Sequence, residues 1–128
     1  MAQKIKVGGI IQNDHLASVS VLVMKDRSGI AAAVLDVLSR RGLNVQFVVQ
    51  VIDHQQQDQM VVCVDRDDLA SAEDAIGLLR EEIRPEAVVA NSHVASLAIF
   101  GPDFRERPGI AGRMFKVLAD QGVNILAI

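Results

Sequence analysis

The sequence predicts an α+β fold of the ferredoxin-like kind, with βαββαβ modules in tandem and the second module incomplete. Two observations predict it. Over residues 16–90 the segments follow the order strand, helix, strand, strand, helix, strand, which is the order of a split βαβ sandwich. The rest of the chain then repeats the first strand, loop, helix and second strand with nearly constant spacing, as expected of an internal repeat.

The first module opens with a strand over residues 16–24, which are rich in β-branched side chains. Ile30, Val34 and Leu38 then recur at the spacing of one helical face. Gly42 is placed to end this helix, because glycine enters the left-handed conformation of a helix C-terminus without steric penalty.

A hairpin is expected next, with strands over residues 43–52 and 59–64 and a solvated turn at 55–58 between them. Apolar residues at helical spacing predict a second helix over residues 69–82. A short strand at 87–90 completes the module.

The second module copies the first in sequence. The matching segments are HVAS at 93–96 with HLAS at 15–18, RPGIA at 107–111 with RSGIA at 27–31, and GVNI at 122–125 with GLNV at 42–45. The copy stops at Ile128, inside its expected second strand. Residues 4–11 alternate charged and apolar side chains before their glycines and predict one more strand.

Composition excludes several classes of function. The net charge is −3, and the chain has no Trp, no Tyr and only four Phe, so it lacks the basic surface and the stacking rings of a nucleic-acid-binding protein. No apolar run approaches the ~20 residues of a membrane helix, and no apolar signal-peptide core is present. The single cysteine fits a reducing compartment, so we expect a cytoplasmic protein.

The loop before the first helix has two interpretations. Asp26 or Ser28 could cap the helix by accepting a backbone N–H, which is the commoner use of such residues. Alternatively, the amides of Gly29, Ile30 and Ala31 could form a partly positive site for a carboxylate.

Two amide side chains interrupt apolar strand segments. Asn44 and Gln50 each need a hydrogen-bond partner if they are buried, within the fold, at an interface or on a ligand. If Gln50 faces solvent on an edge strand, it carries no role.

No residues predict catalysis, a metal or a cofactor. Gly8 and Gly9 lack the lysine or hydroxyl residue of a nucleotide-binding loop. An acidic first helical turn accounts for the aspartates at 65, 67 and 68. The histidines lie on separate elements without ligand-like spacing: His15, His54 and His93. We therefore expect a non-catalytic chain.

Four segments have the patterns of a known family. Residues 26–31 (DRSGIA) stand where that family has D-K-P-G-x-A, residues 43–50 (LNVQFVVQ) match I-N-V-D-x-I-x-Q, and residues 107–115 and 123–125 repeat the matches. Together with residues 7–21 and 64–69, they resemble the regulatory region of aspartate kinases, a tandem of ACT domains. Ser28 replaces the usual proline, Gln46 replaces an acidic residue, and the strand that the family continues beyond Ile125 is missing.

The resemblance implies an amino-acid sensor whose effector, lysine or threonine, binds between ACT domains. Carried over by position, the ligand-binding residues would be Asp26, Gly29, Ile30, Ala31, Asn44, Val45, Gln46 and Gln50, with Asn124 and Ile125 from the second copy. The family inserts the first ACT domain, here residues 12–91, into the second, here residues 1–11 and 92–128.

The resemblance also implies a homodimer and a kinase catalytic subunit as the partner of a regulatory-subunit-like chain. A different class of function stays open: a ligand-blind ACT-type dimerisation module, whose loops only cap helices.

Overall fold

The computed structural model describes residues 4–128, which form two compact units. One unit is Asp14–Ala95, and the other combines the residues up to Asn13 with Ser96–Ile128. No helix within the described residues is both long enough and apolar enough to cross a bilayer.

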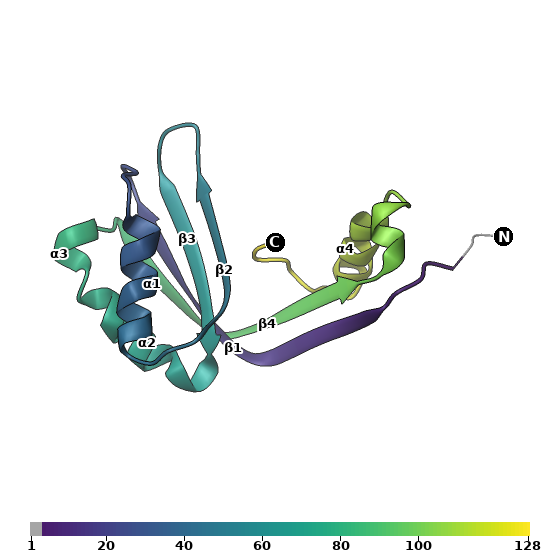
Figure 1. The fold of residues 1–128 in the computed structure, drawn as a ribbon, viewed down its shortest axis with the longest axis horizontal. Coiled ribbons are helices and arrows are strands. Elements are labelled where there is room, and N and C mark those ends of the chain that lie inside the picture. The colour runs from purple at the N-terminus through teal and green to yellow at the C-terminus, as the bar shows by residue number, and fades with distance from the viewer. Residues whose placement is uncertain (1–3) are drawn as a thin grey trace. The chain divides into compact units, whose positions relative to one another are not determined.

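A four-stranded antiparallel sheet has the strand order β2-β3-β1-β4, with helices packed against the part that lies in Asp14–Ala95 (Figure 1). The strands are β1 (Gly9–Val23), β2 (Val45–Ile52), β3 (Asp58–Asp65) and β4 (Ala87–Phe100). The helices of this unit are α1 (Ile30–Arg40), η1 (Arg66–Asp68), α2 (Leu69–Gly77) and α3 (Arg80–Ile83). This order and strand arrangement confirm the predicted ferredoxin-like fold.

The core of this unit lies between the sheet and the helices. Side chains alternate along a strand, so every second residue of β1 and β3 faces the helices. The buried sheet residues are Val19, Val21, Val23, Met60, Val62 and Val64, and the buried helix residues are Ile30, Val34, Leu38, Ala72, Ala75, Ile76 and Ile83. The helical face predicted for α1 is therefore the face that packs, and Gly42 follows this helix with φ +71°, as expected.

The second helix is shorter than predicted. The expected helix over 69–82 is interrupted after Gly77, and α3 starts at Arg80 as a separate turn. Leu79 and Ile83 remain buried across the break, so the apolar face continues although the helix does not. The three-residue helix η1 precedes α2, with Asp65 accepting the N–H of Asp67 at 2.9 Å.

The prediction of separate strands over residues 4–11 and 16–24 was wrong. β1 runs without interruption from Gly9 through residues 12–14, and β4 is one strand rather than a short strand at 87–90 followed by another. These two strands pair with each other: Glu86 N–H donates to the Leu22 carbonyl and Gly8 N–H to the Phe100 carbonyl, at 2.8 and 2.7 Å. Pairing with β4 satisfies the backbone hydrogen bonds of residues 12–14, while their polar side chains reach solvent. A polar stretch therefore does not require a turn. Residues 4–8, predicted to be part of a strand, lie before β1.

The second unit contains η2 (Pro102–Arg105) and α4 (Ile110–Asp120). The repeat seen in the sequence extends to the backbone. Gly109 before α4 has φ +87°, against +92° for Gly29 before α1, and Gly122 has φ +73°, close to Gly42. The strand predicted at 123–128 does not form; these residues are described and adopt irregular structure.

Gly8 and Gly9 have a packing role. A Cβ atom on Gly9 would lie 2.6 Å from Cζ of Phe100, and one on Gly8 would lie 3.2 Å from the same ring. The aromatic ring therefore lies against the glycine backbone, which a larger residue would prevent. This contact accounts for the glycine pair without any phosphate.

Candidate functional site

The amino terminus of α1 has no side-chain cap. Gly29 is the N-cap residue, in the left-handed conformation, and no side chain accepts a hydrogen bond from the first turn. The expectation that Asp26 or Ser28 caps the helix was therefore wrong. Ala33 N–H donates to the Gly29 carbonyl at 2.9 Å, which leaves the N–H groups of the preceding turn directed out of the helix. This end of α1 carries partial positive charge.

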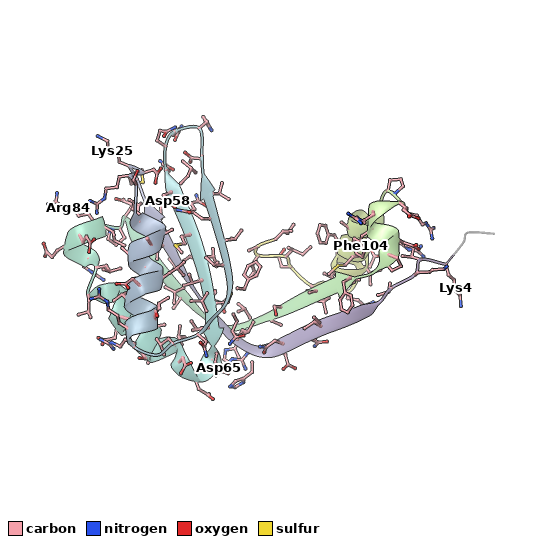
Figure 2. All side chains as sticks on the ribbon, in the orientation of Figure 1. Lys4, Lys25, Asp58, Asp65, Arg84 and Phe104 are labelled. Atoms are coloured by element: carbon pink, nitrogen blue, oxygen red, sulfur yellow. The ribbon has the colours of Figure 1, made fainter. Side chains whose placement is uncertain are left out.

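A buried carboxyl group lies at the same end of the unit (Figure 2). Asp58 begins β3 opposite Val23 and is only 1% exposed. Gln50 of β2 donates through Nε2 to Asp58 Oδ2 at 2.8 Å. The other oxygen, Oδ1, is buried without a hydrogen-bond partner. A buried polar atom of this kind is rare in folded proteins and calls for a specific explanation.

Asp26 is the second acidic group of this cluster. Burial raises the pKa of Asp58, and the carboxyl group of Asp26 raises it further through a side-chain hydrogen bond and its charge. The hydrogen bond from Gln50 acts in the opposite direction and is weaker than burial. Two carboxyl groups at close range favour a state in which one of them holds a proton.

Backbone contacts hold the loop and the hairpin turn together. The N–H of Asp26 donates to the carbonyl of Gln56 at 2.7 Å. Within the turn, Oδ1 of Asp53 accepts the N–H groups of Gln55 and Gln57 at 2.8 and 3.0 Å. The end of β1, the start of α1 and the β2–β3 turn thus form one connected region around Asp58.

The structure brings together half of the residues named from the sequence. Asp26, Gly29, Ile30 and Ala31 lie at the amino terminus of α1. Gln50 is exposed on the edge strand β2, the position for which the sequence predicts no role, and only its hydrogen bond to Asp58 connects it to this region. Three others lie at the opposite end of β2, where Val45 pairs with Val64: Asn44, Val45 and Gln46. Asn124 and Ile125 belong to the second unit, in the irregular segment after α4.

Sequence reasoning missed Asp58. It falls in a run of polar residues, QQQD at 55–58, that indicates a solvated turn. Only the register of the hairpin, with Asp58 opposite Ile52 on one side and Val23 on the other, shows that this residue belongs to the buried strand. No local signal in the sequence separates it from its exposed neighbours.

Sequence reasoning also missed a contact at the other end of β3. His15 Nε2 lies 3.1 Å from Asp67 Oδ1 and 3.8 Å from Asp65 Oδ1, although the histidines have no ligand-like spacing in the sequence. The three side chains offer ligand atoms within 4.8 Å of one another. Asp65 already caps η1, and the side chain of His15 is half exposed, so these are contacts between side chains at the surface.

A shallow hollow of about 430 Å³ lies between the end of β1 and α3. Its charged lining residues balance one another: Lys25, Arg27, Arg84, Glu81, Glu82 and Glu86. The Arg27 guanidinium donates to the Glu82 carbonyl. This mixture of charges selects no class of ligand, so the region around Asp58 remains the candidate site.

Comparison with family models gives matches in both units. An ACT domain model matches residues 17–83, and a second ACT domain model matches residues 97–128. Among curated proteins, the chain is 29% identical over 122 residues to an aspartate kinase of Pseudomonas fluorescens, and 29% identical over 124 residues to an aspartokinase of Thermus thermophilus. Each match covers 95% of this chain, and the chain spans about 30% of the length of these relatives.

Solved structures give the same result. The regulatory subunit of aspartate kinase from Thermus thermophilus, in its ligand-free form, superposes with a TM-score of 0.80 and 28% identity, over 93% of this chain and 78% of that one. The regulatory subunit from Thermus flavus gives a TM-score of 0.82 and 27% identity, over 95% and 80%. The resemblance to the regulatory region of aspartate kinases is therefore confirmed.

Proposed function

The chain belongs to the ACT domain family, and we propose that it is a non-catalytic regulatory module that binds a free amino acid, lysine or threonine. Its similarity to aspartate kinase regulatory subunits supports this function. The observation that carries the proposal is the uncapped amino terminus of α1 beside the Asp26, Gln50 and Asp58 cluster.

Each part of an amino acid has a chemical counterpart in this region. The effector carboxylate is placed on the N–H groups of Gly29, Ile30 and Ala31, where the helix end favours an anion. Asp26, which is half-buried, accepts the ammonium group. Gln50 can donate to the effector side chain or accept from it, since an amide does both.

The resemblance assigns further contacts. Asn124 and Ile125 are proposed to contact the effector from the second module. Asn44, Val45 and Gln46, which the resemblance also names, begin β2 at the end away from Gln50, too far along the strand to contact the same effector molecule. We place the first ACT module within residues 12–91 and the second in residues 1–11 and 92–128. The division of the structure near residues 14 and 95 supports that arrangement.

The partner is proposed to be a kinase catalytic subunit. An effector controls such a partner only if it binds one arrangement of the modules more tightly than another. The chain itself contributes the sensor, and the catalytic chemistry belongs to the partner.

Two variants test the site. Gln50→Ala should weaken effector binding by about 1 kcal/mol, the usual net contribution of one hydrogen bond, because Gln50 is exposed on the edge strand. Ser28→Ala is the control, because Ser28 is exposed and provides no cap for α1. Calorimetric titration of both variants with lysine and threonine measures the difference. Equal affinities for Gln50→Ala and the unchanged protein would contradict the assignment.

One observation favours the ligand-blind dimerisation module as a second candidate. Among the described residues β2 pairs only with β3, and its other edge is open. This strand also exposes Val48, Val51 and Ile52, with exposed fractions of 44, 57 and 41%. An open edge with apolar side chains can pair with another chain whether or not a ligand is bound.

A further inference from the structure

We propose that Asp26 and Asp58 share one proton in the ligand-free protein and release it when the ammonium group of the effector binds. This inference rests on the proposed amino-acid site and adds its regulation by pH. Asp58 then accepts the effector ammonium together with Asp26.

The orphaned oxygen is the first argument. Oδ1 of Asp58 is buried without a partner, while Oδ2 accepts from Gln50. A carboxylate cannot leave a buried oxygen unpaired without a large desolvation cost. A proton held between Asp58 and Asp26 would satisfy this oxygen, because a protonated carboxyl group is a hydrogen-bond donor.

Among the described residues, no cation contributes to the raised pKa of Asp58. Its register neighbours, Val23 and Ile52, are apolar, and so are the residues that α1 buries against the sheet. The titratable group that acts on it is Asp26 from the loop. The carboxylate of Asp53, in the turn, accepts two N–H groups of the turn itself.

Two cations flank the cluster along the chain. Arg27 is directed to the Glu82 carbonyl, and Lys25 is exposed. Neither cation contributes to the raised pKa of Asp58, so we assign the positive charge between the two carboxyl groups in the free protein to a proton.

An effector ammonium supplies the same charge. When it binds between Asp26 and Asp58 and donates to Oδ1 of Asp58 as well as to Asp26, both carboxylates can ionise, and the proton that they shared passes to solvent. The proton and the ammonium group therefore compete for one place. Below the pH at which the free pair loses its proton, effector affinity should rise about tenfold per pH unit, the linkage for release of one proton.

The test is calorimetric titration of the intact chain with lysine and threonine, in buffers of different ionisation enthalpy. The series covers pH values from the ordinary aspartate pKa of 3.8 to neutrality, where the effector ammonium stays charged. The unchanged protein should release up to one proton per effector at the acidic end and fewer as the pH rises. Asp58→Asn, which keeps an acceptor for Gln50, should release none and bind with a nearly constant affinity.

The matched control is Asp36→Asn, on the exposed side of α1, where Asp36 pairs with Arg40. It should keep the proton release of the unchanged protein. If the role of Asp58 is purely structural, Asp58→Asn will bind the effector more weakly by the same factor at every pH, and its affinity will still rise with pH as in the unchanged protein. That result would overturn this inference and leave the proposed function standing. If neither lysine nor threonine binds the unchanged protein, the proposed function fails and this inference fails with it.

Discussion

At the scale of single residues, Asp58 ties the stability of the unit to pH. Burial raises its pKa, so between its ordinary value of 3.8 and the raised value the folded state holds more protons than the unfolded state. The free energy of unfolding therefore falls as the pH rises through this interval. The stabilisation is fully present below pH 3.8 and is lost as the pH passes the folded-state pKa.

We therefore expect Asp58→Asn to become more stable relative to the unchanged protein as the pH increases. Urea unfolding of the two proteins across an acid-to-neutral series measures the difference. Asp36→Asn again serves as the control, since its carboxylate is exposed. Parallel stability curves for Asp58→Asn and the unchanged protein would show that Asp58 titrates normally.

At the scale of elements, Gly29 sets the path from β1 into α1. Its φ is +92°, and nothing lies within 4 Å of the Cβ that an alanine would add. The cost of Gly29→Ala is therefore conformational, about 1–2 kcal/mol of stability. Circular dichroism during urea unfolding measures this loss.

Gly77 is the matched control, because it also has open space for a Cβ but lies in α2. Gly77→Ala should stabilise the protein by about 0.5–1 kcal/mol, since alanine is the better helix residue. Equal effects of the two substitutions would contradict the role assigned to the left-handed turn.

The elements that periodicity determines could be predicted from the sequence. Ile30, Val34 and Leu38 identified α1 and its packed face, and the apolar runs identified the β2–β3 hairpin. Long-range pairing could not be predicted. Residues 12–14 are polar, yet they belong to β1, which pairs with β4. Residues 123–128 do not form a strand, because strand structure requires a neighbouring strand to pair with as well as a suitable local sequence.

In the candidate site, too, features set by local sequence could be predicted and features set by long-range pairing could not. The Asp26–Ala31 loop and Gln50 carried local patterns that could be read, whereas the burial of Asp58 depends on strand register. The contact of His15 with Asp67 likewise joins residues that are 52 positions apart. Hydrogen-bond partners that distant are set by the fold and leave no spacing in the sequence.

At the scale of the whole molecule, we expect the chain to self-associate. The open edge of β2 and its exposed Val48, Val51 and Ile52 favour pairing with a second copy. Light scattering over micromolar concentrations should give a mass above that of one chain. Val51→Lys should shift the equilibrium toward the monomer, because a charged residue on an edge strand opposes pairing.

The control for that experiment is Leu78→Lys. Leu78 is 66% exposed but lies between α2 and α3, away from the β2 edge. It should leave the mass unchanged. A monomeric mass for the unchanged protein throughout the concentration range would rule out association through this edge.

The central claim is that this ACT chain senses an amino acid, and titration of the unchanged protein with lysine and with threonine tests it most directly. Glycine, which lacks a side chain for Gln50 to contact, is the comparison ligand. The account predicts saturable binding of lysine or threonine at millimolar concentration or below, with weaker binding of glycine. Absence of binding by every amino acid at millimolar concentration would contradict it and leave the ligand-blind dimerisation module as the function.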